Sequence, residues 1–95
     1  MEEPSHYPNR IRQLRMEKDL TQRELAFIVG YESLSAFSQI EAGRKLPSLP
    51  TALKLEVALQ RLVPDIFPQL YDKVRDRVAQ RRMDVFERKE ARKKP

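Results

Sequence analysis

The sequence predicts an all-α protein: a five-helix domain followed by a helical extension. Apolar residues recur at helical spacing, and no run alternates between apolar and polar as a half-buried strand would. Capping residues and prolines punctuate these runs where helices are expected to begin. The 95 residues include only 2 glycines, which does not fit an all-β chain with many tight turns.

The first two predicted helices cover residues 10–18 and 22–29. Asn9 is placed to cap the first helix. Thr21 and Glu24 have capping-box spacing at the start of the second helix, and the glycine directly after it supplies the backbone freedom that ends it. The side chains expected to face the core are Ile11, Leu14, Leu20, Leu25, Ala26 and Val29.

The next two predicted helices cover residues 34–41 and 49–59. Ser33 is the best cap for the first of them, and Gly43 stops it. A Pro-Ser pair precedes the second, whose own Pro50 is tolerated in the first turn. The side chains expected to face the core are Phe37, Ile40, Leu49, Leu53, Leu55 and Leu59.

A short turn over residues 64–67 is expected to return Ile66 and Phe67 to the core. A long polar helix then covers residues 69–92. One stripe of that helix, at 100° per residue, holds Phe67, Leu70, Tyr71, Val74, Val78 and Val85.

Two arginines, Arg81 and Arg88, fall at the d positions of this stripe and argue against a long coiled coil. We expect residues 69–78 to be ordered and residues 87–95 to fray, because isolated helix ends are marginal in water. The first half could pack on the domain or on a second copy, and the second half could lie along a DNA backbone.

The charge is distributed unevenly. Residues 1–68 hold 9 Lys and Arg against 9 Asp and Glu, whereas residues 69–95 hold 10 against 5. We therefore divide the chain into a flexible tail (1–8), a globular domain (9–68) and a basic helix and tail (69–95). A basic extension fits an anionic partner, nucleic acid first; the alternative is an Arg-rich solvated helix.

Several classes of protein are disfavoured. There are no cysteines, and the single histidine, His6, lies in a proline-flanked stretch, so we expect no metal site. Paired histidines, a phosphate-binding glycine loop and a clustered carboxylate site are all missing, so we expect no cofactor and no enzyme activity. The sequence has no secretion signal and no apolar run long enough to span a bilayer, which predicts a cytoplasmic address without membrane contact.

The corner between residues 22–29 and 34–41 is the most informative feature. Two helices joined by a tight glycine-containing turn can form a helix-turn-helix, whose second helix enters the DNA major groove. An αα-hairpin without a DNA role could show the same spacing. In a helix-turn-helix, four outward residues of the second helix would be free to meet base edges: Leu34, Ser35, Ser38 and Gln39.

The surrounding segments resemble the lambda-repressor and Cro-like (XRE-type) helix-turn-helix family. The resemblance runs from about residue 9 to residue 67 and is carried by IRQLRMEKDLTQRELA, SQIEAGRKLPSL and ALKLEVAL. It implies a five-helix DNA-binding domain. The resemblance also implies a partly buried salt bridge between Arg15 and Glu41, which we interpret as structural.

The resemblance implies two sets of DNA contacts. It aligns Gln39 and Ser35 with base-contact positions, while Leu34 could meet a thymine methyl or simply pack. Glutamine can pair bidentately with adenine. The expected phosphate contacts are Arg10, Thr21, Gln22, Arg44 and Lys45.

Two features depart from the family pattern. The turn GYES is one residue longer than the commonest spacing, and Glu56 stands where a small apolar residue is usual. Glu56 could pair with an arginine or alter local packing. A second, local resemblance links GYESLSAFSQ to the second helix-turn-helix of AraC-type activators, without the aromatic residue expected next.

We therefore predict a sequence-specific DNA-binding transcriptional regulator, a repressor acting as a homodimer on double-stranded DNA. The alternative is an antitoxin-type module in which residues 69–95 bind a protein partner and DNA binding serves autoregulation. The use made of residues 69–95 separates the two hypotheses.

Overall fold

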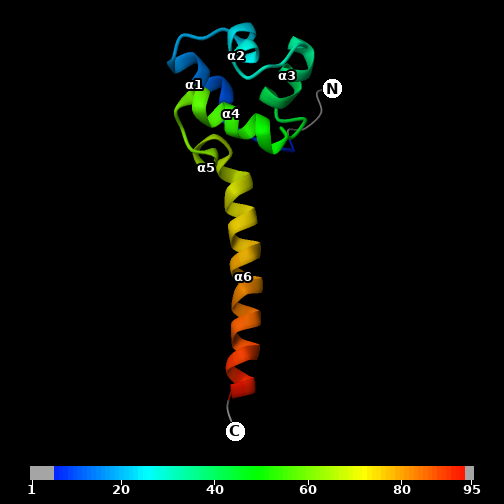
Figure 1. Cartoon of the computed structure of the whole chain (residues 1–95), viewed down its shortest axis with the longest axis vertical. Helices are drawn as coiled ribbons and strands as arrows, with labels where there is room; N and C mark the ends of the chain where they lie inside the picture. Colours follow the sequence, from blue (N-terminus) through cyan, green and yellow to red (C-terminus); the bar gives the residue numbers. More distant parts are fainter. Residues whose placement is uncertain (1–5, 94–95) are drawn as a thin grey trace.

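The computed structural model describes residues 6–93, and its regular elements are six helices. Five short helices form a globular domain, and the sixth leads away from it as a single rod (Figure 1). The helices are α1 (Ile11–Glu17), α2 (Gln22–Ile28), α3 (Leu34–Glu41), α4 (Leu49–Leu59), α5 (Val63–Ile66) and α6 (Pro68–Lys93). The predicted all-α class is confirmed.

The core lies between α1, α2, α3, α4 and α5. Its members are apolar side chains that recur three or four residues apart on each helix, so each helix turns one stripe inward. The buried cluster comprises Ile11, Leu14, Leu25, Ala26, Val29, Phe37, Ile40, Leu55, Leu59, Ile66 and Phe67. These positions agree with the sequence prediction for every helix except α4.

Helix α4 turns a different face inward from the one predicted. Leu49 and Leu53 were expected in the core but are 71% and 49% exposed. Leu55 and Leu59 are buried as expected, together with Thr51 and Ala52 from the same face. The helix carries two apolar stripes, and the core takes the one that contains the smaller residues.

The start of α1 also differs from the prediction. The N-cap is Arg10, without a side-chain cap, rather than Asn9. Asn9 still accepts a hydrogen bond from the Ile11 N–H at 3.0 Å, so its side chain satisfies one donor of the first turn from one residue further out.

Glu56 stabilises the neighbouring helix. Its half-buried carboxylate accepts a hydrogen bond from the Val63 N–H at 3.0 Å, at the first residue of α5. A carboxylate at this position satisfies a donor that a helix start otherwise leaves free. This contact, rather than an arginine partner, accounts for the acidic residue in the fourth helix.

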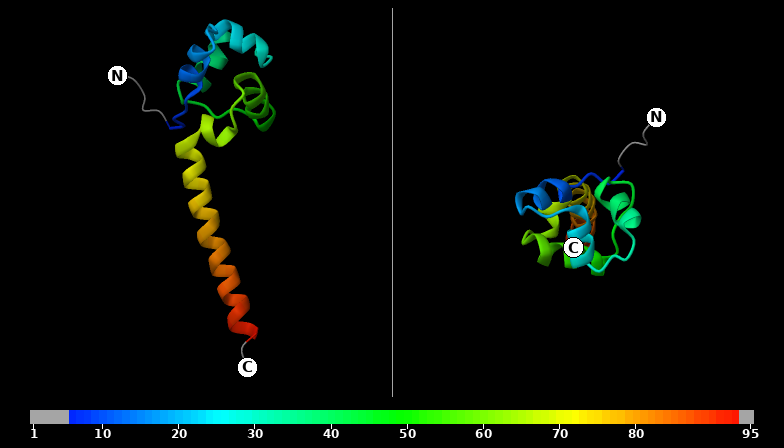
Figure 2. Two further views of the ribbon diagram at one scale, coloured as in Figure 1. Left: turned by 90° about the vertical axis from the view of Figure 1, so that its left-hand side faces the viewer. Right: turned by 90° about the horizontal axis from the view of Figure 1, so that it is seen from above.

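Helix α6 runs unbroken over 26 residues and buries none of its side chains. Two views at right angles show it leaving the domain from the end opposite α2 (Figure 2). The prediction that residues 87–95 fray is wrong for residues 87–93, which are helical. The last two residues lie outside the described range. Exposed pairs along the helix, such as Gln80 with Asp84, support it locally.

Candidate nucleic-acid interface

A complete capping box starts α2. The Glu24 N–H donates to the Thr21 hydroxyl at 3.0 Å, and the Thr21 N–H donates to the Glu24 carboxylate at 2.8 Å. The hydrogen bond from the Thr21 backbone, and then that from its side chain, lowers the pKa of Glu24. The predicted box is therefore present, and it holds Thr21 and the neighbouring Gln22 at a fixed helix start.

A Schellman motif ends α2 and turns the chain toward α3. Gly30 has φ +79°, its N–H donates to the Phe27 carbonyl, and the Tyr31 N–H donates to the Ala26 carbonyl at 2.8 Å. Glycine adopts this left-handed backbone at little steric cost. The Tyr31 ring also packs edge-on against Phe37, with 5.7 Å between ring centroids. The turn is therefore fixed by the backbone and by packing, although it is one residue longer than usual.

Helix α3 begins at the predicted cap. The Ser33 hydroxyl accepts a hydrogen bond from the Ala36 N–H at 3.2 Å. Phe37 and Ile40 are fully buried on one face. The opposite face carries three of the predicted base-contact residues, Ser35, Ser38 and Gln39, and the fourth, Leu34, lies at its edge toward the core.

These four side chains are not equally accessible. Ser35 is exposed, whereas Ser38 and Gln39 are half-buried along the edges of the same face. Leu34 packs against the core cluster, which favours the packing role left open by the sequence. The polar part of the face is therefore formed by Ser35, Ser38 and Gln39.

An ion pair ties α1 to the end of α3. Arg15 donates from Nη2 to Glu41 Oε1 at 2.9 Å and from Nε to Oε2 at 3.2 Å. The two side chains are only 12% and 7% exposed. Arg15 also donates from Nη1 to the Leu20 carbonyl at 2.8 Å. This two-pronged geometry fixes the orientation of α3 relative to α1.

The loop after α3 presents two cations beside that helix. Arg44 and Lys45 are both exposed. Gly43, at φ +77°, begins the loop, and the Arg44 N–H donates back to the Gln39 carbonyl at 2.9 Å. The predicted phosphate contacts Arg44 and Lys45 thus start directly where the polar face of α3 ends.

The N-terminal segment holds this loop in place, which the sequence prediction missed. The N–H groups of His6 and Tyr7 both donate to the Gly43 carbonyl, and Asn9 Nδ2 donates to the Ile40 carbonyl at 2.9 Å. The part of the predicted flexible tail that the structure describes is therefore attached to the end of α3. Backbone donors carry most of this attachment, so side-chain patterns gave no signal for it.

The remaining predicted phosphate contacts divide into two groups. Thr21 is exposed and Gln22 half-buried at the start of α2, beside the corner. Arg10 lies elsewhere: its guanidinium donates to Gln13 Oε1 at 3.3 Å and to the Asp65 carbonyl at 3.4 Å, next to α5. The structure does not bring Arg10 together with the other predicted contacts.

Comparison with known proteins agrees with this geometry. A family model described as helix-turn-helix matches residues 11–64, more than half of the chain. The chain belongs to the XRE-type helix-turn-helix family. It is therefore a DNA-binding transcriptional regulator.

A solved structure gives a second comparison. The chain is similar to the restriction-modification controller protein C.AhdI from Aeromonas hydrophila, with 38% sequence identity and a TM-score of 0.55. The match covers 61% of this chain and 86% of that one. No curated protein matches the chain. Helix α6 lies beyond the residues that the family model matches.

Two features are absent from residues 6–93, the part of the chain that the structure describes. Nowhere in this part of the chain do three or more His, Cys, Asp or Glu side chains gather in a way that could hold a metal ion. Among its helices, none is both long and apolar enough to cross a membrane.

Proposed function

We propose that this regulator reads a specific operator by placing α3 in the major groove, and that it represses transcription as a homodimer. The observation that carries the proposal is the rigid presentation of the polar face of α3. The capped start at Ser33 and the Schellman turn fix the N-terminal end of this helix. The Arg15–Glu41 pair and the hydrogen bonds to the Gly43 carbonyl fix its C-terminal end. Base readout needs such rigidity, because hydrogen bonds to base edges are strongly directional.

The proposed base contacts are Ser35, Ser38 and Gln39. The amide of Gln39 can donate and accept at once, which suits the N6 and N7 edge of adenine. Ser35 and Ser38 carry hydroxyls that can pair with either kind of edge group. Gln39 therefore has the largest expected share in discrimination.

The proposed phosphate contacts are Gln22 at the start of α2 and the cations Arg44 and Lys45 beyond the end of α3. They flank the polar face along the chain, so phosphates on either side of a groove could be held while α3 lies within it. Such contacts give affinity and orientation but carry no sequence information directly.

The relation to a restriction-modification controller protein supports a regulatory role for a chain of this size. A domain of five short helices has little surface to offer DNA. Two copies on a two-fold operator would double that surface and place two recognition helices one DNA turn apart.

The test compares Gln39→Ala with Arg44→Ala in the full chain. We expect Gln39→Ala to weaken binding to the preferred operator by about 5- to 150-fold, corresponding to roughly 1–3 kcal/mol, while non-specific binding is kept. Arg44→Ala should weaken binding to all duplexes alike and lower the slope of log K against log salt by about 1.

Two outcomes would contradict the proposal. Gln39→Ala with unchanged base preference would show that another face of α3 reads the DNA. A loss of affinity without any preferred operator would leave α3 as a scaffold, as in the antitoxin alternative. Arg44 is exposed and Gln39 half-buried, and neither belongs to the buried core, so circular dichroism should show unchanged helix content.

A further inference from the structure

Helix α6 is a structural element without a visible role in DNA reading. It begins after the family match ends, buries none of its 26 residues and extends about 39 Å at 1.5 Å per residue. Helices in proteins gain most of their stability from packing an apolar face against another surface. The exposed apolar side chains of α6 are therefore expected to pack against another surface.

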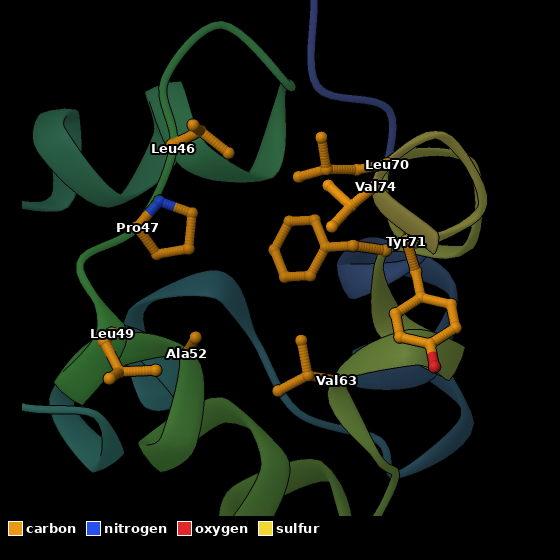
Figure 3. A pocket seen from close by; sticks show the side chains of 9 residues that line it. Leu46, Pro47, Leu49, Ala52, Val63, Leu70, Tyr71 and Val74 are labelled. Carbon is orange, nitrogen blue, oxygen red and sulfur yellow. The ribbon is translucent and has the colours of Figure 1, made fainter. Parts of the chain in front are cut away.

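An apolar groove lies where α6 joins the domain. It has a volume of about 350 Å³, and Figure 3 shows its walls: α4 and the loop before it on one side, and the first turns of α6 on the other. No charged side chain lines it. The lining residues are Leu46, Pro47, Leu49, Ala52, Val63, Phe67, Leu70, Tyr71 and Val74.

Exposed apolar side chains continue from both walls of this groove. The outer face of α4 carries Leu49, Leu53 and Val57 at i, i+4 and i+8, and α6 carries a matching stripe. These side chains are 43–77% exposed and together offer on the order of 800 Å², the area that each partner of a standard interface buries. We define the α4–α6 face by the exposed apolar residues that line this groove or continue the stripes of its two walls: Leu46, Leu49, Leu53, Val57, Tyr71, Val74 and Val78.

We propose that a second copy of this chain covers the α4–α6 face, with the first turns of the two α6 helices packed in parallel across the two-fold axis. The face alone has the area of a stable dimer interface, and its groove without charged side chains favours an apolar partner. The same surface contains both projecting apolar side chains and a groove that can receive them, as a self-complementary two-fold contact needs. The inference rests on the proposed function, which calls for two recognition helices.

The parallel arrangement follows from the position of α6. Both α3 helices of a dimer must face one side of the DNA, so the two-fold axis runs from the DNA through the dimer. Helix α6 leads away from the end of the domain that carries α2 (Figures 1 and 2). An axis in this direction leaves the two α6 helices side by side and pointing the same way.

Charge limits how far the two helices can pair. Tyr71, Val74 and Val78 fall at successive a, d and a positions, but Arg81 and Arg88 take the next d positions. A parallel dimer would bring each arginine against its own copy, which is unfavourable for like charges. Pairing is therefore expected to end near Val78, with the basic distal halves apart.

A cysteine cross-link tests the arrangement, because the chain contains no cysteine of its own. Val78→Cys and Met83→Cys make a matched pair: the two side chains are 57% and 56% exposed on opposite sides of α6. Under mild oxidation without DNA, Val78→Cys should form a disulfide-linked dimer on a non-reducing gel, and Met83→Cys should stay single. Equal cross-linking of both, or of neither, would overturn the proposed contact.

A charge at the same two positions gives the second test. Val78→Glu should raise the dimer dissociation constant at least 10-fold in sedimentation equilibrium, and Met83→Glu should change it less than 3-fold. A wild-type monomer at about 100 μM, or a dimer that tolerates Val78→Glu, would refute the proposed interface. If Val78→Glu still forms a dimer that binds the operator, the proposed interface is refuted and the proposed function stands. If Val78→Glu disrupts the dimer but the wild-type chain prefers no operator, the proposed function is refuted and the interface stands.

Discussion

Single residues with left-handed backbone define the ends of the helices around the corner between α2 and α3. Asp19, Gly30 and Gly43 have φ values of +56°, +79° and +77°, and each follows the C-cap residue of α1, α2 or α3. In each case the following N–H donates back into the last turn of its helix. Glycine at two of these positions could be predicted from the sequence as a helix stop, whereas Asp19 could not, because aspartate more often marks a helix start.

Gly30 provides a direct test of this backbone requirement. A Cβ at Gly30 would lie 3.7 Å from Lys54 Nζ, an ordinary contact, so an added methyl group meets no clash. Gly30→Ala should still cost about 1 kcal/mol, because a left-handed conformation is unfavourable for alanine. Thermal unfolding should show a loss of about 4–8 °C, with Gly30→Asn losing less. An unchanged melting temperature would show that the turn relaxes freely.

Glu24 gives the domain a predictable response to acid. Its hydrogen bonds with Thr21 favour the ionised carboxylate and hold its pKa below the usual 4.5. A lowered folded-state pKa contributes stability above the unfolded value, and this contribution is lost as pH falls through the folded value. Glu24→Gln keeps a capping-box side chain without the titration. Urea unfolding between pH 5 and 3 should therefore show a smaller stability loss in Glu24→Gln than in wild type; equal losses would contradict the assignment.

Among the elements, α3 depends on contacts that are distant in sequence. Its cap at Ser33 and its buried Phe37 and Ile40 follow from local spacing and were predicted correctly. The bonds of its C-terminal end to the N-terminal segment were not, since they involve backbone groups of His6 and Tyr7. Side-chain patterns report which face of a helix is buried, but they do not report which backbone donors reach its end.

Helix α4 shows a second limit of the sequence. It carries one apolar stripe with Leu49, Leu53 and Val57 and another with Ala52, Leu55 and Leu59. The sequence prediction chose leucines from both stripes. Packing against the other helices buries only the second stripe. The spare stripe is the one that forms part of the proposed dimer contact.

The tie between α1 and α3 can be broken with one substitution. Glu41→Ala removes both oxygens that Arg15 contacts and leaves the guanidinium largely buried with only the Leu20 carbonyl. We expect a loss of about 3 kcal/mol, as is typical when one partner of a buried pair is removed. Chemical denaturation measures the loss, and the double variant Arg15→Met with Glu41→Met should recover much of it. A loss below about 1 kcal/mol would show that the pair acts as a surface salt bridge.

The molecule has two ends that point in opposite directions: the end of the domain that carries α2 and α3, and the far end of α6. The domain at one end holds α3 rigidly, and α6 carries an unpaired apolar stripe followed by a basic half at the other. The sequence predicted both parts and the change in charge between them. It could not show that α6 leaves the domain after its first turns, because its stripe fits packing on the domain equally well.

The sharpest test of operator reading by α3 is a binding selection from a random duplex library, run with the full chain near physiological salt. We expect an enriched palindrome whose half-sites lie one DNA turn apart, or a multiple of it, because two α3 helices would read it across a two-fold axis. Gln39→Ala should relax the preference at one position in each half-site. Retention of DNA without any enriched sequence would contradict operator reading by α3.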